Sequence, residues 1–405
     1  MMNIPANPPL TGTRVLDFGH IVAAPFCTRI LADLGADVAK IETSLRKDYA
    51  GGSRLKAVDD IRDRPPAYLS MNRNKRSITI NLKTNSGHAL ITRLVEVADV
   101  VVENFSGGVM DRLGLGYDRL RAVNPRLIFV SMSGYGHKGP RQSWRSMNLN
   151  LQAYSGLMLA TGNEGDPPVA ISNSWNDFVG GLHACFGILE ALADRQRTGL
   201  GAYLDLSQFE CSVASLGPLL YATSQNRDLP PRTGNRSTVA APQGCYRCAG
   251  EDKWCVISVE NDEQWRALVG ALGSPSWAGD VRFDSVTGRL SAHDKIDEHL
   301  ERWTKQRNNT EVESLLRGAG VPAERVRNID DIVDSSHDRG IFRVLKYPSG
   351  SSRLVTGLPF TFSHSPLACL SPAPLLGEHN REILRDWLRL SDGEIADLED
   401  QGALR

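Results

Sequence analysis

The 405-residue sequence lacks several features that would place it in a broad class at once. It has no uninterrupted apolar run near the roughly 18 residues of a membrane span, and residues 1–9 show neither the basic region nor the apolar core of a signal peptide. Its 46 Lys and Arg nearly balance its 47 Asp and Glu, so no overall field favours nucleic acid or an anionic membrane. We therefore expect a soluble cytoplasmic protein that binds no nucleic acid and no membrane, and that meets anionic ligands with local basic groups.

Cysteine is also scarce. The seven cysteines form no even disulfide framework, and Cys245 and Cys248, in the run Cys-Tyr-Arg-Cys, are the one suggestive pair, with Cys255 downstream. A structural zinc site needs four ligands, and neither a second pair nor spaced histidines follow. The sequence therefore predicts no metal site.

A third missing feature is the glycine fingerprint of dinucleotide-binding proteins. Residues 13–42 read as a βαβ unit, with strands at 14–18 and 38–41 and a helix from Pro25 to about residue 34. The connecting loop, residues 19–25, lacks the spacing G-x-G-x-x-G that lets a backbone approach a pyrophosphate. An NAD-dependent dehydrogenase is therefore a minor alternative.

Strands and helices alternate through the first half of the chain. Strands are expected at 77–82, 100–103 and 127–131, with helices at about 86–98 and 117–122. Such alternation predicts a mainly parallel, doubly wound α/β sheet, in which ligands lie beyond the carboxyl ends of the strands. The loops that matter are then 19–25, 103–108 and 131–140, while residues 43–70 are expected to form a polar surface excursion.

Changes in composition predict the domain boundaries. We expect a large doubly wound (Rossmann-like) domain from residues 1–221 and 376–405, and a small α+β domain from residues 244–335. Residues 222–243, rich in Arg, Pro, Asn and Thr, and residues 336–375, rich in Ser, Pro and Gly, are expected to be long linkers with few periodic segments.

One acidic residue lies at the N-terminus of a predicted, tightly packed helix. Ser174-Trp-Asn-Asp177 fits a capping box, and the helix behind it carries a stripe of small residues along which another helix could approach: Gly180, Ala184, Gly187 and Ala191. Asp177 is thus either a helix cap or a nucleophile that attacks an activated acyl group. The two interpretations are compatible, because a helix N-terminus favours an ionised carboxylate.

Five motifs stand in an order that resembles the family III CoA-transferases, the group that includes formyl-CoA:oxalate and carnitine CoA-transferases. They are Pro9–Gly19, Leu34–Glu42, Asn72–Ile78, Glu103–Phe105 and Asn124–Arg126. The resemblance implies that Asp177 carries the acyl group, that acyl-CoA and a free carboxylic acid are the substrates, and that no metal is required. It also implies an interlocked homodimer, in which each chain threads through the other.

The resemblance further implies which residues contact CoA. They are His20, Val22 and Ala23 of the first loop, Asn72, Arg73 and Lys75, then Asn104 and Phe105 with the neighbouring Arg112, and Arg145. Arginine and lysine suit the several phosphate charges of CoA. A solvated surface charge is an equal alternative for Arg73 and Lys75, and His20 could be a hydrogen-bonded structural histidine.

At some positions the sequence differs from the formyl-CoA members of the family, so it does not identify the donor and acceptor acids. Val22 stands where those members carry glutamine, and Thr43 where they carry arginine. Residues 234–242 replace a tetraglycine loop, as in the carnitine-type branch, and their Gly234, Asn235 and Arg236 are candidates for contacting the acyl group.

The implied mechanism is a ping-pong reaction through anhydride and thioester intermediates on Asp177, and two alternatives remain. A 2-methylacyl-CoA racemase would need a histidine near position 147, where this sequence has Met147, although His137 and His183 are near in sequence. A CoA-binding protein without turnover would use Asp177 only as a cap.

Overall fold

The computed structural model describes residues 7–44, 65–226, 231–335, 341–347 and 350–405. The chain divides into two units, the first made of Met1–Met158, Ala170–Arg227 and Gly340–Arg405 and the second of Leu159–Val169 and Asp228–Arg339. Most of the surface excursion expected for residues 43–70 lies outside the described residues. Each unit is considered by itself below.

The first unit is built on a six-stranded sheet in which every neighbouring pair of strands is parallel. Its strands are β1 (Arg14–Asp17), β2 (Asp37–Glu42), β3 (Arg76–Thr79), β4 (Val100–Glu103), β5 (Ile128–Ser133) and β6 (Ala202–Ser207), in the order β3-β2-β1-β4-β5-β6. The predicted parallel α/β sheet is confirmed. The order reverses direction between β1 and β4, which is where sheets of this kind bind ligands.

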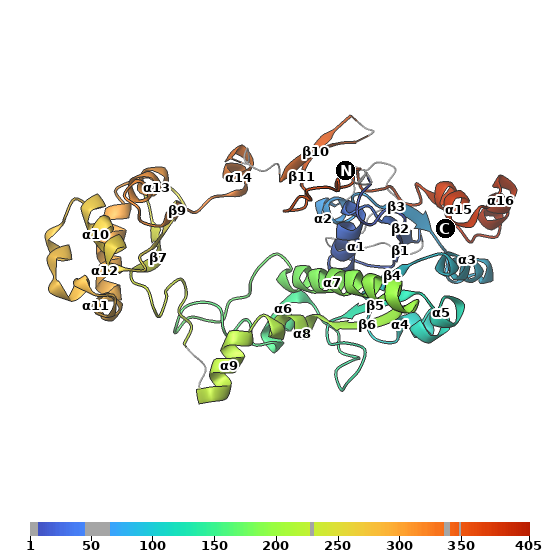
Figure 1. Cartoon of the computed structure of the whole chain (residues 1–405), viewed down its shortest axis with the longest axis horizontal. Helices are drawn as coiled ribbons and strands as arrows, with labels where there is room; N and C mark the ends of the chain where they lie inside the picture. The colour runs from blue at the N-terminus through green and yellow to red at the C-terminus, as the bar shows by residue number, and fades with distance from the viewer. Residues whose placement is uncertain (1–6, 45–64, 227–230, 336–340, 348–349) are drawn as a thin grey trace. The chain divides into compact units, whose positions relative to one another are not determined.

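Alternate strand residues build a core on each face of the sheet, as the two-residue period of a strand requires. Val15 packs with helices α1 (Ala23–Asp33) and α7 (Trp175–Thr198), whereas Leu16 packs with the helices of the opposite face. That opposite face is covered by α3 (Asn85–Glu96), α5 (Tyr117–Val123), α15 (Asn380–Leu388) and α16 (Asp392–Asp400). Helix α15 lies beside α3, far from it in the sequence, and α16 packs on α15 (Figure 1).

The remaining elements of the first unit are short. They are α2 (Pro66–Met71), α4 (Val109–Arg112), α6 (Asn148–Tyr154), α8 (Gln208–Ala214), α9 (Gly217–Asn226) and a hairpin of β10 (Phe342–Lys346) and β11 (Ser352–Thr356). The hairpin stands in the segment 336–375 that was expected to be a linker, and α9 extends into the other expected linker. Among the described residues, no helix combines the length and apolar composition that crossing a bilayer requires.

The small residues of α7 admit close neighbours, but not in the way the sequence suggested. A Cβ atom at Gly187 would come within 2.5 Å of Leu204 in β6, and one at Gly180 within 3.1 Å of Gln208 in α8, so the predicted stripe faces β6 and the start of α8. Helix α1 approaches at Gly181, outside the stripe, where a Cβ atom would lie 2.7 Å from the Phe26 ring and 2.9 Å from the Ala23 carbonyl oxygen. The amino-terminal end of α1 is therefore fixed against the first turns of α7.

A buried ion pair holds the loop between β1 and α1. The Asp17 carboxylate is 0 % exposed and lies 2.8 Å from Lys75 Nζ, which also donates to the Pro25 carbonyl oxygen at 2.9 Å. Lys40 Nζ donates to the Gly19 carbonyl oxygen at 2.8 Å. Burial raises the pKa of Asp17, but Lys75 and Lys40 lower it further, so the net pKa lies below its usual value. Two lysines thus bind the two ends of one loop.

The second unit has its own antiparallel sheet and core. Its strands are β7 (Gln243–Arg247), β8 (Trp254–Ser258) and β9 (Ala323–Arg325), in the order β7-β8-β9. Its helices are α10 (Asp262–Ala271), α11 (Val286–Ser291), α12 (His293–Thr304), α13 (Asn309–Gly318) and α14 (Ile329–Ser335), with 3₁₀ turns η2 (Ser276–Gly279) and η3 (Val281–Asp284). A separate small sheet with helices is confirmed.

Three cysteines lie in or beside this small sheet. Cys248 and Cys255 are buried in its core, and Cys245 is half-buried on β7. Burial raises the pKa of each of the three thiols, which makes them poor nucleophiles and poor ligands. Within the described ranges, no group of three His, Cys, Asp or Glu side chains is placed to hold a metal ion.

Replacing Lys75 with Met should destabilise the protein strongly. The substitution leaves the Asp17 carboxylate buried without its nearest counter-charge, which costs about 3–5 kcal/mol in comparable buried pairs. Urea unfolding followed by circular dichroism measures the loss. Lys305→Met, which breaks an exposed pair with Glu301, is the matched control and should have a much smaller effect. Equal losses in the two variants would contradict a structural role for the Asp17–Lys75 pair.

Candidate active site

Asp177 is the third residue of α7, and the turn that precedes it is strained. Asn173 and Ser174 both have left-handed backbones, with φ of 59° and 54°. Such conformations cost of order 1–3 kcal/mol in residues other than glycine and are concentrated at functional sites. The Ser174 side chain accepts no bond from a backbone amide, so the predicted capping box is wrong. The left-handed backbone places the serine carbonyl, not its hydroxyl, 2.9 Å from the Asp177 amide nitrogen.

The environment of Asp177 disfavours its charge. Burial raises the pKa of the carboxyl to about 6, and a hydrogen bond from the Ser174 side chain lowers it by less than burial raises it. Desolvation and the helix N-terminus thus act in opposite directions on this carboxyl. At neutral pH the carboxylate is ionised but poorly solvated, which is the state of an activated nucleophile.

Two short helices, α6 and α8, hold the residue that precedes Asp177. Asn148 Oδ1 on α6 accepts from the backbone amide of Asn176 at 3.3 Å, and Asn176 Nδ2 donates to Ser212 Oγ on α8 at 2.7 Å. Asn176 is fully buried, and its Oδ1 has no hydrogen-bond partner among the described residues. A rigid backbone therefore presents Asp177.

The first loop meets the loop after β4. The backbone amide of His20 donates to Asn104 Oδ1 at 2.8 Å, and Asn104 Nδ2 donates back to the His20 carbonyl oxygen at 2.9 Å. The rings of His20 and Phe105 lie 5.2 Å apart between centroids. The structure thus brings three predicted site residues together at the point where the strand order reverses. Ala23 of the same loop packs against α7 at Gly181, one turn after Asp177, and Val22 precedes it as the N-cap of α1.

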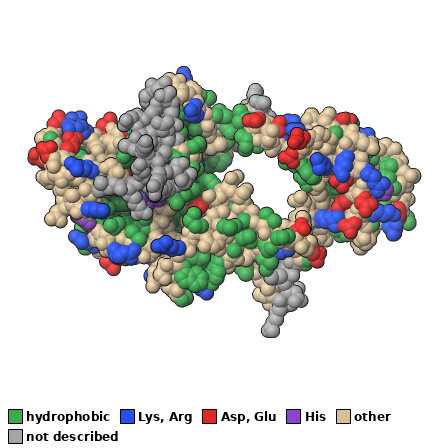
Figure 2. Space-filling view, turned by 180° about the vertical axis from the view of Figure 1, so that it is seen from behind, with side chains coloured by type: hydrophobic (Ala, Val, Ile, Leu, Met, Phe, Trp, Pro, Cys, Tyr) green, Lys and Arg blue, Asp and Glu red, His purple; other side chains and the backbone are tan. Residues whose placement is uncertain are grey.

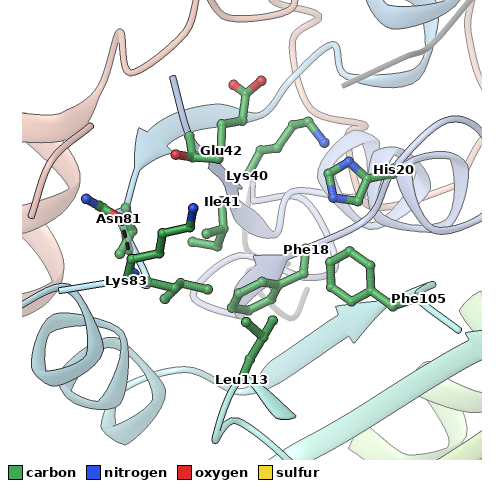
Figure 3. A pocket seen from close by; sticks show the side chains of 12 residues that line it. Phe18, His20, Lys40, Ile41, Glu42, Asn81, Lys83, Phe105 and Leu113 are labelled. Carbon is green, nitrogen blue, oxygen red and sulfur yellow. Dashed lines mark hydrogen bonds between the residues drawn. The ribbon is translucent and has the colours of Figure 1, made fainter. Parts of the chain in front are cut away.

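A cavity of about 430 Å³ opens beyond the carboxyl ends of β1, β2 and β3. Its lining is mainly apolar with a few polar groups, and consists of Phe18, His20, Lys40, Ile41, Glu42, Thr43, Ile80, Asn81, Leu82, Lys83, Phe105 and Leu113. Figure 3 shows His20 and Phe105 on one side of the cavity and Asn81 and Lys83 on the other. Sequence reasoning missed Lys40 and Lys83, whose only signal was a position in or just after a strand.

Two of the predicted CoA contacts, Arg112 and Arg145, are exposed arginines in different places. Arg112 is exposed at the end of α4, beside Leu113 of the cavity wall, and borders a second, shallow hollow of about 680 Å³ with His88 and Arg119. Arg145 is exposed in the loop after β5, where it forms no hydrogen bond or ion pair with another described residue. Neither arginine lines the 430 Å³ cavity, although Leu113, the residue after Arg112, does.

Asn72, Arg73 and Lys75 are buried rather than solvated. Their exposed fractions are 1 %, 1 % and 2 %. Arg73 makes a two-pronged contact with Asp33, at 3.2 and 2.6 Å, while Asn72 Oδ1 accepts from Lys75 Nζ at 2.9 Å. The alternative of a solvated surface charge is therefore wrong for Arg73 and Lys75. None of the three side chains lines the 430 Å³ cavity.

The predicted acyl-contact residues belong to the second unit, whereas Asp177 belongs to the first. Gly234 donates its amide to the Gly162 carbonyl oxygen at 2.9 Å, Asn235 is exposed, and Arg236 pairs with Asp294 at 2.6 Å and Asp297 at 2.5 Å. The ion pairs fix the Arg236 side chain to α12. Contact between these residues and an acyl group remains a prediction.

The histidines that a racemase could use are engaged elsewhere. His183 is exposed six residues after Asp177, about 9 Å further along the axis of α7, with its Nδ1 2.9 Å from the Val179 carbonyl oxygen. His137 lies between Glu103 and Asp205. Met147 is 68 % exposed and has no proton to exchange.

A doubly wound sheet with an apolar cavity at its reversal point, and a desolvated carboxylate on an adjoining helix, is typical of an α/β enzyme that acts on a nucleotide-bearing substrate. The chain matches CoA-transferase family III over residues 10–380. It belongs to this family, and the prediction that it is a CoA-transferase is thereby confirmed.

Two curated relatives and one solved structure illustrate the similarity. The formyl-CoA:oxalate CoA-transferase of Streptomyces avermitilis is 33% identical over 98% of this chain and 99% of its own length. The succinyl-CoA–D-citramalate CoA-transferase of Chloroflexus aurantiacus is 32% identical over 96% of this chain and 97% of its own. A CAIB/BAIF family protein from Brucella suis superimposes with a TM-score of 0.86 at 32% identity, covering 94% of this chain and all of that one.

Replacing Asp177 with Asn should stabilise the protein at neutral pH. The pKa of Asp177 is about 6 in the folded protein and near 3.8 in the unfolded chain. The free energy of unfolding therefore falls as pH rises from about 4 to about 6. Asn cannot ionise, so the variant should unfold with a free energy about 2–3 kcal/mol above wild type at pH 7 and near wild type at pH 4. Urea unfolding across this pH range measures the difference. Exposed Asp400→Asn serves as control, and equal pH profiles for wild type and Asp177→Asn would refute the raised pKa.

Proposed function

We propose that the protein moves CoA from an acyl-CoA donor to a free carboxylic acid, with the Asp177 side chain carrying the acyl link between them. The observation that supports this most is the desolvated carboxylate of Asp177, with a pKa of about 6, on a clamped backbone next to the first loop. The relatives are named as transferases that use formyl-CoA, acetyl-CoA or succinyl-CoA with oxalate or D-citramalate.

The first half of the reaction converts Asp177 into a thioester. Its carboxylate oxygen attacks the carbonyl carbon of the donor, the C–S bond breaks, and CoA leaves as a thiolate while a mixed anhydride forms. The thiolate then attacks the aspartyl carbonyl carbon of the anhydride. The anhydride C–O bond breaks, the donor acid leaves as a carboxylate, and CoA is held as an aspartyl thioester.

The second half runs these steps in reverse with the acceptor. The acceptor carboxylate attacks the aspartyl thioester, which gives a new anhydride and CoA thiolate. The thiolate attacks the acceptor acyl carbon, and Asp177 is released as a carboxylate. No proton is consumed and none is produced, because every species that leaves is an anion that the next step uses or releases. The site mainly has to position CoA and stabilise oxyanions.

We place the nucleotide end of CoA in the 430 Å³ cavity. Phe18, Ile80 and Phe105 offer apolar surface for a base, while Lys83 of the lining supplies positive charge for phosphates, and Arg112, the residue before Leu113 of the lining, is a further candidate. The first loop leads from His20 at this cavity to Ala23 beside α7, so it offers a path from the cavity towards Asp177. Arg145 is a further candidate for a phosphate contact.

The proposed role of Asn72, Arg73 and Lys75 in CoA binding is indirect. Their side chains are buried behind the first loop, where Lys75 binds Asp17 and Pro25. We assign them to holding the loop in the conformation that CoA meets. His20, Val22 and Ala23 are then left to contact CoA through the loop itself.

The two alternatives lose support from the same site. A racemase needs a second acid or base close to its aspartate, and position 147 is methionine while His137 is held by two carboxylates. A protein that only binds CoA would have no need of a strained turn and a carboxylate with a raised pKa.

We also propose that the protein is a homodimer, interlocked as the family resemblance implies. Hydrophobic side chains reach the surface of the first unit, as Figure 2 shows for one of its faces. On α7, Leu182, Phe186 and Leu189 follow a helical spacing and are 54%, 72% and 37% exposed. Such a stripe favours coverage by a second copy of the chain.

Replacing Asp177 with Ala should abolish acyl exchange and leave CoA binding intact. Loss of the nucleophile removes the covalent route, and a decrease of at least about 10³-fold in exchange is expected. Exchange of isotopically labelled acid into acyl-CoA and calorimetric titration with CoA measure the two properties separately. Asp400→Asn is the control. Wild-type exchange in Asp177→Ala would eliminate the nucleophile hypothesis.

The native mass should be about twice that of one chain. An interlocked dimer separates only when it unfolds, so sedimentation equilibrium should give the same doubled mass at every loading concentration. A mass equal to one chain, or one that falls smoothly on dilution, would contradict the interlocked dimer.

A further inference from the structure

A shallow hollow adjoins the cavity assigned above to CoA, and its charge is of one sign. The hollow measures about 680 Å³ and is bordered by Asn85, His88, Ala89, Thr92, Arg112, Leu113, Gly114 and Arg119. Leu113 lines both spaces, so the hollow begins where this wall of the 430 Å³ cavity ends. The bordering residues include two arginines and a histidine but no acidic residue. The hollow is therefore suited to an anion.

The two arginines border the hollow without an acid to neutralise them. Arg112 and Arg119 are both exposed, and neither guanidinium forms a hydrogen bond or an ion pair with another described residue. A Cβ atom at Gly114 would lie 2.9 Å from Arg119 Nη1 and 3.4 Å from His88 Cε1. Arg119 and His88 thus meet over the bare backbone of a glycine. Their N–H donors remain available to a ligand.

The first turns of α3 form another border of the hollow. Asn85, His88, Ala89 and Thr92 recur at the three- and four-residue spacing that places side chains on one face of a helix. The first turn of this 12-residue helix contains no acidic residue. Because the amino-terminal end of a helix carries a partial positive charge, α3 adds to the field of the two arginines.

The phosphates of CoA occupy two different places in that molecule. A diphosphate joins the nucleoside to the arm that carries the thiol, so it should follow the path from His20 towards Asp177. The 3′-phosphate of the ribose branches away from this arm. The hollow likewise adjoins the cavity at Leu113, and no residue of the first loop borders it. Figure 3 shows Leu113 well apart from His20 on the cavity wall.

We propose that the hollow binds the ribose 3′-phosphate of CoA, with Arg112 and Arg119 as its counter-charges and His88 as a further donor. A guanidinium can donate two parallel N–H bonds to phosphate oxygens, which suits this group. The two arginines then recognise the feature that distinguishes CoA from dephospho-CoA. The inference rests on the proposed binding of CoA in the 430 Å³ cavity.

Calorimetric titration of the full-length protein with CoA and with dephospho-CoA tests the inference without turnover. Both dissociation constants are measured at one pH and one ionic strength for wild type and three variants. Arg119→Met removes a charge from the hollow, and Ala89→Glu adds a carboxylate to it at an exposed helical position. Arg121→Met is the matched control, because Arg121 is an exposed arginine of the same helix that does not border the hollow. Circular dichroism shows whether each variant is folded.

Wild type and Arg121→Met should bind CoA at least about tenfold more tightly than dephospho-CoA. Arg119→Met and Ala89→Glu should each bind CoA about tenfold more weakly than wild type, with the affinity for dephospho-CoA almost unchanged. The inference predicts this selective loss because dephospho-CoA lacks the group that the hollow would hold.

Two kinds of failure can be told apart. Equal affinity of wild type for the two ligands would overturn the inference, and so would an unchanged preference for CoA in Arg119→Met. Equal weakening of both ligands by Arg119→Met would overturn it too, because the arginine would then act on the diphosphate. Failure of wild type to bind either ligand would overturn the proposed function, and the inference with it.

Discussion

The architecture of the site depends on the ion pair between Asp17 and Lys75. Asp17 is the last residue of β1, and its two carboxylate oxygens receive bonds from Lys75, Thr28 and the amide of Gly19. Burial lowers the pKa of Lys75 to about 8, so the neighbouring carboxylate is needed to keep the lysine charged in the core. A side chain at position 19 would lie 2.7 Å from both Ala24 Cβ and Asp17 Oδ1, which explains the glycine there. The pair thereby fixes the loop that meets Asn104 on one side and α7 on the other.

Asp177 is a partly buried carboxylate, and its surroundings differ from those of Asp17. Among the residues that the structure describes, no cation pairs with it; two strained residues precede it, and burial raises its pKa to about 6. Each of these features costs stability in a fold that stabilises Asp17 with two lysines. Such costs are typical of residues kept for reactivity rather than for packing. The difference between the two aspartates separates the scaffold of the site from its reacting group.

The sequence predicted what depends on local patterns. Alternation of strands and helices was enough for the parallel sheet, and a polar turn before an apolar helix was enough to locate Asp177. It could not predict the burial of Arg73 and Lys75, because their partners stand 40 and 58 positions earlier and tertiary packing alone brings them together. The left-handed backbone of Ser174 is a similar case, since its residue type favours an ordinary cap. The hairpin β10–β11 was missed in a segment whose Ser, Pro and Gly suggested a linker.

The most direct test of the account is to look for the acyl group on Asp177. The protein is incubated with a panel of acyl-CoA donors, trapped with hydroxylamine or borohydride, and digested, and the peptide that contains Asp177 is examined by mass spectrometry. The account predicts modification of Asp177, dependent on the donor, with no other carboxylate modified. Unmodified Asp177 with every donor, in protein that still binds CoA, would contradict it.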